Sequence, residues 1–203
     1  MCRFASFVLT KDSEFWSNTT DSHEQIIAEH GLTADGATGP NILRVEISPV
    51  GSLNAPFGQW EYKVDQDIFP KWHDPATCEQ RTRAALSRRF PDGIPVEFPG
   101  SLDLRDTPVT SLGKLASVGG SLDLRVTKVT SLGNLASVGG SLNLRGTKVT
   151  SLGNLASVGG NLYLGGTPVT SLGNLASVGG NLYLGGTKVT VPATCKVRGS
   201  VYH

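Results

Sequence analysis

The sequence predicts an α+β protein: a small N-terminal domain of mixed helices and strands, followed by a right-handed β-solenoid with a parallel sheet. Three observations predict this class. A 20-residue unit recurs from Ser101 onward, residues before Gly100 show both helix and strand periodicity, and the composition changes between the two parts. We expect the N-terminal domain at 1–98, the solenoid at 99–190 and a C-terminal cap at 191–203.

Charge and glycine are divided unevenly along the chain. Residues 1–100 carry nine Lys and Arg against 14 Asp and Glu, for a net charge of −5, whereas residues 101–203 carry nine against three, for +6. Of the 25 glycines, 18 follow Gly100, and all three tryptophans precede it. Such shifts indicate two differently built regions. They also suggest self-association through the oppositely charged halves.

The sequence argues against several protein classes. No apolar run approaches the ~18 residues of a membrane helix, and the N-terminal apolar segment is too short for a signal peptide. The three cysteines, Cys2, Cys78 and Cys195, are widely spaced and form no paired metal motif. We therefore expect a reduced, cytoplasmic protein that does not bind membranes.

Each repeat keeps its apolar positions fixed. Leu102 and Leu104 alternate, which predicts a short strand, and the later apolar residues are three apart, which predicts an irregular return limb. Gly119 and Gly120 predict a tight bend with positive φ. In the first unit the apolar positions are Leu102, Leu104, Val109, Leu112, Leu115 and Val118.

The stretch Leu102-x-Leu104-x-x-Thr107-x-Val109 resembles the leucine-rich repeat family at its short end, over about residues 101–190. The resemblance implies that the outward face of the strands binds partners. Threonine takes the position of the family's asparagine ladder, and we expect its hydroxyl to bond the backbone of the next coil. A parallel β-helix of another type remains an alternative.

The outward columns of the solenoid are the candidate binding face. We expect Tyr163 and Tyr183 to stack about 4.8 Å apart and to form a recognition patch with Asn161 and Asn181. The structural alternative is a pair of tyrosines that only shields the sheet. The binding candidates are Asp103, Arg105, Asp123, Arg125, Asn143, Arg145, Asn161, Tyr163, Asn181 and Tyr183.

Nucleic acid is an improbable partner for this face. Asp103 stands two residues before Arg105, and Asp123 stands likewise before Arg125, so the pairs partly neutralise each other. No aromatic residues interleave with the arginines, as a single-strand binding platform would require. A protein partner is the better expectation. In the tail, we expect Cys195 to be a buried cap residue.

Before the repeats, the pattern predicts five elements. Strands are expected at 4–9, 41–48 and 60–64, and helices at 23–30 and 75–89. The segments 7–12, 21–24, 44–47 and 60–67 are similar to an N-terminal module of phage and phage-like bacterial proteins with repeat tails. That resemblance covers about residues 4–90 and implies a phage setting without implying an activity.

Four constellations in this region could carry chemistry, and each also has an ordinary structural reading. Met1-Cys2-Arg3 resembles the start of class II glutamine amidotransferases. A metal could join His23 and His30 to His73 or Asp74. Glu61-x-Lys63, with Glu46 upstream, is similar to the strand motif of metal-dependent nucleases. Asp65 and Asp67 could bind a cation or cap a turn.

The sequence therefore predicts a non-enzymatic protein–protein interaction of phage type, directed at a host or defence-related partner. We assign no catalytic residue, no cofactor and no metal. The alternative is a metal-dependent hydrolase or nuclease in the N-terminal domain, with the repeats as its targeting module. That alternative would be favoured if five residues lay together in one cleft: His23, Glu46, Glu61, Lys63 and Asp67.

Overall fold

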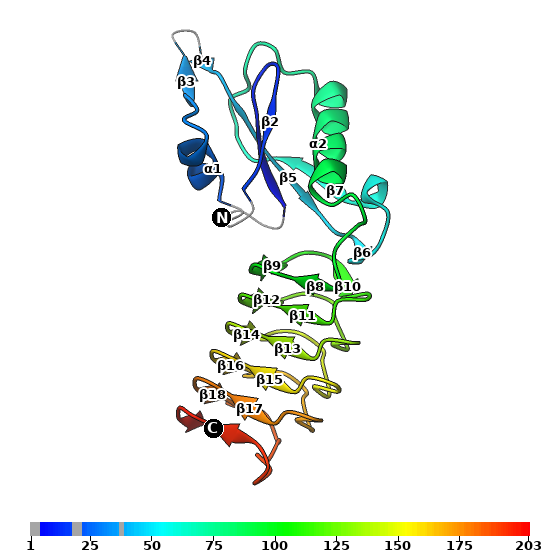
Figure 1. Cartoon of the computed structure of the whole chain (residues 1–203), viewed down its shortest axis with the longest axis vertical. Coiled ribbons are helices and arrows are strands. Elements are labelled where there is room, and N and C mark those ends of the chain that lie inside the picture. The colour runs from blue at the N-terminus through cyan, green and yellow to red at the C-terminus, as the bar shows by residue number, and fades with distance from the viewer. Residues whose placement is uncertain (1–4, 18–21, 37–38) are drawn as a thin grey trace. The chain divides into compact units, whose positions relative to one another are not determined.

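The computed structural model describes residues 5–17, 22–36 and 39–203, and it forms two compact units (Figure 1). The first unit comprises the chain through Ser48 together with Pro56–Gly93. The second comprises Pro49–Ala55 and Ile94–His203. The segment 49–55 thus belongs to the solenoid unit, although it lies early in the sequence.

The first unit is an antiparallel sheet in the order β2-β1-β5-β7. Its strands are β1 (Ser6–Leu9), β2 (Glu14–Phe15), β5 (Leu43–Ser48) and β7 (Glu61–Val64). Two further short strands, β3 (Asp35–Gly36) and β4 (Gly39–Pro40), pair with each other, and a 3₁₀ turn, η1 (Phe57–Gln59), precedes β7. The predicted strands at 4–9, 41–48 and 60–64 correspond to β1, β5 and β7.

Both predicted helices are confirmed. In α1 (His23–Glu29), the Ser22 hydroxyl caps the N-terminus by accepting from the Gln25 amide, and Ile26 packs with Val8 and Ile42. In α2 (Pro75–Arg89), the Asp74 carboxylate accepts from the Thr77 amide at 2.8 Å. These caps satisfy amides that have no partner within the helix. Neither helix, within the residues described, is long and apolar enough to cross a membrane.

The second unit is a β-solenoid of two six-stranded parallel sheets. What we call the serine sheet contains β8 (Glu97–Phe98), β11 (Ser117–Val118), β13 (Ser137–Val138), β15 (Ser157–Val158), β17 (Ser177–Val178) and β19 (Lys196–Val197). The tyrosine sheet contains β9 (Leu102–Asp103), β12 (Leu122–Asp123), β14 (Leu142–Asn143), β16 (Leu162–Tyr163), β18 (Leu182–Tyr183) and β20 (Val201–Tyr202). The predicted α+β class with a solenoid is confirmed.

The return limb is more regular than its spacing predicts. It ends in a strand of the serine sheet, so each coil contributes two short strands rather than one. Residues 20 apart face each other along both sheets up to β17 and β18, as with Leu122 and Leu142. The leucine and valine columns lie inside, and Leu104, Leu124 and Leu144 are fully buried.

The glycine pair between the two sheets has a different role from the expected one. Neither Gly139 nor Gly140 has a positive φ. A Cβ on Gly139 would instead lie 2.1 Å from the carbonyl oxygen of Gly119 in the preceding coil. Glycine is required here because neighbouring backbones approach closely, and not because the chain turns left-handed.

The ladder of side-chain hydrogen bonds between coils does not lie in the threonine column where it was expected. The hydroxyl of Thr127 donates to Leu124 O at 2.8 Å within its own coil, and Thr147 does the same to Leu144 O at 2.7 Å. The repeating side-chain bonds from one coil to the next come from the column at the start of each unit. Ser121 Oγ accepts from the Ser141 amide at 3.0 Å.

Both ends of the solenoid continue its backbone pairing. At the start, β6 (Gly51–Ser52) pairs with β10 (Val109–Ser111), and Asn54 Oδ1 accepts from the Lys114 amide at 2.6 Å. At the end, the segment expected to be a cap adds a strand to each sheet, as β19 and β20. The thiol of Cys195 is buried there, as expected, and burial raises its pKa.

Candidate functional site

A stack of tyrosines is the most distinctive outward feature of the tyrosine sheet. The rings of Tyr163 and Tyr183 lie 4.7 Å apart and nearly parallel, at 6°. Tyr202 extends the stack at 4.8 Å from Tyr183. The spacing follows from strand separation, because in-register residues on adjacent parallel strands repeat at about 4.8 Å. The predicted pair is thus one part of a stack of three.

Tyr202 is absent from the sequence-based candidates because the last coil departs from the 20-residue period. Tyr183 pairs with Tyr202, 19 residues later. A register shortened by one residue would have aligned Val201-Tyr202 with Leu182-Tyr183. Tyr202 is also the most exposed ring of the stack, at 48%.

Asn161 and Asn181 hold the tyrosines in place. Asn161 Nδ2 donates to Tyr163 OH at 3.1 Å, and Asn181 Nδ2 donates to Tyr183 OH at 3.2 Å. Their side-chain oxygens continue the ladder, since Asn161 Oδ1 accepts from the Asn181 amide at 2.7 Å. Both asparagines therefore act as supports of the ring stack.

The charged candidates form internal pairs at the start of the face. Arg105 binds both carboxylate oxygens of Asp103, and Arg125 Nη2 lies 2.7 Å from Asp123 Oδ2. Hydrogen bonding to Asp123 raises the pKa of Arg125. These pairs present little net charge to a partner.

Arg145 differs because Asn143 replaces the aspartate of the earlier coils. It has no ion pair among the described residues, and Asn143 Oδ1 accepts only the Arg145 backbone amide at 3.3 Å. The guanidinium instead lies over the Tyr163 ring, with Cζ 4.5 Å from the ring centroid. A cation–π contact thus joins the charged coils to the aromatic ones.

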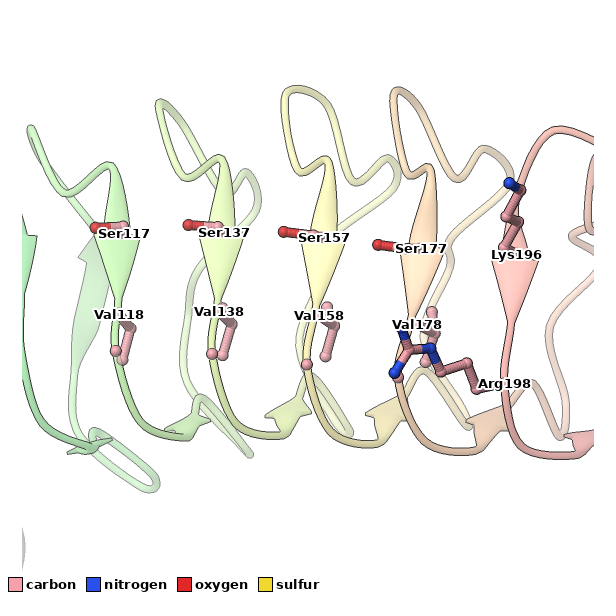
Figure 2. A pocket seen from close by; sticks show the side chains of 14 residues that line it. Ser117, Val118, Ser137, Val138, Ser157, Val158, Ser177, Val178, Lys196 and Arg198 are labelled. Atoms are coloured by element: carbon pink, nitrogen blue, oxygen red, sulfur yellow. The ribbon is translucent and has the colours of Figure 1, made fainter.

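The serine sheet carries a shallow groove of about 490 Å³ (Figure 2). Serine hydroxyls line up along it, and Lys196 and Arg198 stand at its last coil. The inner valines of the same strands are buried. The groove repeats one hydroxyl from coil to coil, so it offers less variety to a partner than the tyrosine sheet does. The repeated residues are Ser117, Ser137, Ser157 and Ser177.

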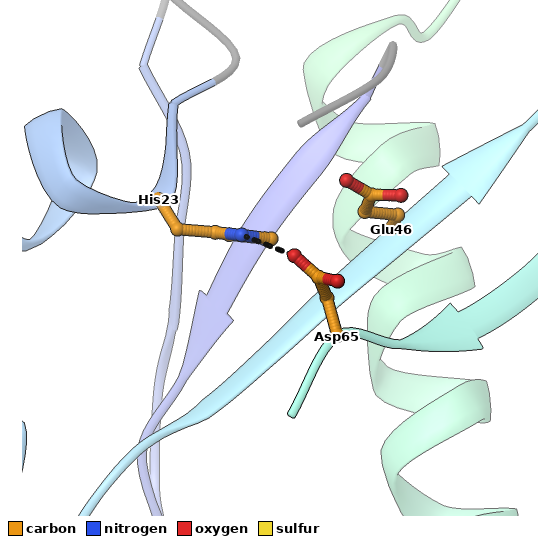
Figure 3. A group of neighbouring side chains, drawn as sticks. All are labelled: His23, Glu46 and Asp65. Atoms are coloured by element: carbon orange, nitrogen blue, oxygen red, sulfur yellow. Dashed lines mark ion pairs between the residues drawn. The ribbon is translucent and has the colours of Figure 1, made fainter. Parts of the chain in front are cut away.

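In the first unit, three ionisable side chains converge on one side of the sheet (Figure 3). One ligand atom from each of His23, Glu46 and Asp65 lies within 4.8 Å of the other two. His23 Nδ1 is 3.4 Å from Asp65 Oδ2, and His23 Nε2 is 3.1 Å from the carbonyl oxygen of Val45. His23 and Glu46 are buried, whereas Asp65 is about one-third exposed.

The chain brings these residues together from three separate elements. His23 opens α1, Glu46 lies in β5, and Asp65 follows β7, with its amide bonded to Arg44 O at 2.8 Å. Gln66 secures this position, because its side chain bonds the Arg44 amide at 2.7 Å and Ile42 O at 3.2 Å.

The other predicted metal ligands lie apart from this cluster. His30 bonds Trp16 O at 3.1 Å, His73 stacks on Phe69, and Asp74 caps α2. In the nuclease-like motif, Lys63 lies opposite Glu46 in the sheet and Glu61 lies two residues earlier in the same strand as Lys63. Both Glu61 and Lys63 are exposed, however, as is Asp67. Of the five residues expected in one cleft, His23 and Glu46 therefore meet in the buried cluster, and Asp65 is its third member. The Met1-Cys2-Arg3 segment lies outside the described residues.

These features define a two-unit protein with a parallel β-solenoid, an outward tyrosine stack and a polar cluster in the first unit. A repeat solenoid of this kind is compatible with a role in protein interaction. Comparisons with protein-family models, with curated proteins and with solved structures found no match.

Proposed function

We propose that this chain is a non-enzymatic binding protein that recognises a protein partner through the tyrosine sheet. The observation that carries the proposal is the stack of Tyr163, Tyr183 and Tyr202, with the Arg145 guanidinium lying over the first ring. Tyrosine offers a large contact area at a low entropic cost and is enriched among residues that dominate binding energy.

The differences between coils support this face over the others. The buried columns hardly vary, whereas the outward column of the tyrosine sheet runs Asp103, Asp123, Asn143, Tyr163, Tyr183. The face therefore has a direction: paired charges come first, then one unpaired cation, then stacked rings. A partner can bind such a face in one register, which a uniform array would not specify.

The chemistry of the face indicates what the partner carries. The rings favour apolar or aromatic side chains, and Arg145 favours a carboxylate placed beside them. Asp103–Arg105 and Asp123–Arg125 lie at the periphery of this site and add polar contacts. We propose an acidic segment with apolar side chains as the recognised element.

The resemblances from the sequence supply the finer proposal. A leucine-rich-repeat-like solenoid behind a phage-type module suggests a phage protein that acts in the bacterial cytoplasm on a host or defence-related partner. A metal-dependent hydrolase in the first unit is the second candidate, and convergence of His23 and Glu46 with Asp65 favours it.

Affinity purification from bacterial lysate with quantitative mass spectrometry tests the binding proposal. The full chain should enrich a partner, and the Tyr163→Ser, Tyr183→Ser double variant should lose it by tenfold or more. Thr130→Ala with Thr150→Ala, at exposed positions outside both sheets, is the matched control and should retain it. Equal recovery by all three proteins would contradict a role for the tyrosine stack.

A further inference from the structure

We propose that His23, Glu46 and Asp65 bind one divalent cation of the zinc or manganese type. One imidazole nitrogen and two carboxylates lie within 4.8 Å of one another. Ligands at about 2.1 Å from a tetrahedral cation lie about 3.4 Å from each other. The 3.4 Å between His23 Nδ1 and Asp65 Oδ2 matches that edge.

The hydrogen bonds of His23 support a cation at Nδ1. Its Nε2 faces the carbonyl oxygen of Val45 at 3.1 Å, and because a carbonyl only accepts, Nε2 must carry a proton. In a neutral ring, Nδ1 then presents a lone pair toward the Asp65 carboxylate, which is repulsive. A cation between the two atoms removes that repulsion. The alternative is a second proton on the ring.

The same arrangement is the usual one for a metal-bound histidine. Such a ring donates its other N–H to a carbonyl or carboxylate, and this bond fixes the tautomer and the ring direction. Val45 O provides that acceptor from the central strand β5. The 3.4 Å gap to Asp65 is also longer than the 2.7–2.9 Å typical of a charge-assisted N–H···O bond.

Two of the three proposed ligands are buried, and the third is reached from solvent. His23 is 1% exposed and Glu46 is 5% exposed, so both have lost most of their contact with water. Access would come from the side of Asp65, which is 34% exposed. Arg44 and Lys63, near Glu46 in the sheet, carry positive charges that lower the affinity for any divalent cation, so the bound metal must be one that bonds strongly to imidazole.

The ligand set selects the class of cation. Imidazole with carboxylates suits Zn²⁺ and Mn²⁺, whereas Mg²⁺ and Ca²⁺ prefer oxygen ligands alone. Three protein ligands leave a fourth position for water or a substrate oxygen, as in catalytic zinc sites. The site would therefore be open to an exogenous ligand.

Metal titration of the full chain tests this inference. After EDTA treatment and removal of the chelator, calorimetry with Zn²⁺ and with Mn²⁺ should give one site per chain, and the metal should raise Tm. Asp65→Asn, at a partly exposed position, should weaken binding at least tenfold and abolish the rise in Tm. Asp67→Asn and Glu61→Gln, exposed carboxylates outside the cluster, are the controls and should bind as the unaltered chain does.

A nitrogen-15 NMR spectrum of His23 makes the test independent of folding defects. Zn²⁺ should move the Nδ1 resonance to that of a coordinated nitrogen. If both ring nitrogens remain protonated with one equivalent of metal present, or if Asp65→Asn binds equally well, the site is an ion pair and the inference is overturned. Either result leaves the binding test on the tyrosine sheet unaffected.

Discussion

Val126 occupies a backbone conformation that β-branched residues rarely adopt. Its φ is 60°, and its side chain is 64% exposed, so side-chain packing offsets little of the backbone strain. The equivalent position in later coils is glycine, as at Gly146 with φ 72°. We expect Val126→Gly to increase the free energy of unfolding by about 1 kcal/mol, measured by urea denaturation. Asp106→Gly should increase the free energy of unfolding by less, because aspartate tolerates this region of φ. If Val126→Gly gives no increase, or only the same increase as Asp106→Gly, then Val126 is not strained.

Tyr62 should make stability fall at high pH. Burial, followed by the nearby Cys78 and Glu79, raises the pKa of Tyr62 well above its ordinary value of 10. The hydroxyl, which lies near Thr82, has no partner of standard hydrogen-bond geometry among the described residues.

The raised pKa sets the direction of the effect. The folded chain holds the Tyr62 proton more tightly than the unfolded chain does, so its contribution is complete below pH 10 and declines as pH rises above 10. We expect Tyr62→Phe to lose less stability between pH 8 and pH 10.8 than the unaltered chain. Denaturation measured at each pH gives the free energy of unfolding, and an equal loss in the two proteins across that range would refute this role.

At the scale of the coil, the glycine pair sets how closely neighbouring coils pack. A methyl group at Gly139 would meet the Gly119 carbonyl at 2.1 Å, and backbone cannot move aside as a flexible side chain can. We expect Gly139→Ala to destabilise the solenoid by about 1–3 kcal/mol or more, as overpacking does. Gly185→Ala is the matched control, because no atom lies within 4 Å of its added Cβ and its φ is not positive. Equal thermal stability of the two variants would count against this reason for the glycines.

Periodicity determines how much of these elements could be predicted. The buried columns and the stacking of Tyr163 on Tyr183 follow from the repeat alone, because one in-register coil places every copy. The second sheet could not be predicted, because each of its strands has one large apolar residue, such as Val118, and lacks the alternating pair that Leu102 and Leu104 provide in the first sheet. The sequence predicts the ladder in the threonine column, as at Thr127, whereas the structure has it at Ser121, because which hydroxyl reaches the next coil depends on the corner geometry.

The cluster in the first unit was harder to predict because it depends on tertiary structure. His23, Glu46 and Asp65 come from a helix, a strand and a strand end, and no local spacing relates them. The sequence predicts His23 and Glu46 in one candidate cleft, but it joins Asp65 to Asp67 instead of to these two residues. The signal in the sequence is Glu46 itself, an acidic residue between Val45 and Ile47 that the structure buries in β5.

For the whole molecule, the near-zero net charge conceals two opposed halves. Residues 1–100 carry −5 and residues 101–203 carry +6, so copies of the chain can attract each other through unlike halves. This attraction is long-ranged and carried by exposed groups, including Lys128, Lys148 and Lys188. Salt should therefore weaken it strongly, unlike an association driven by apolar burial.

Sedimentation velocity can separate these two kinds of association. We expect self-association at about 20 mM salt and a monomer above about 0.3 M, where the Debye length falls to a few ångströms. Replacing Lys128, Lys148 and Lys188 by Glu brings residues 101–203 to zero net charge and should abolish association at low salt. The same three positions changed to Arg keep the charge and should preserve it. A chain that stays monomeric at 20 mM salt, or arginine and glutamate variants that behave alike, would remove charge complementarity as the cause, because only the sign of the charge distinguishes the two variants.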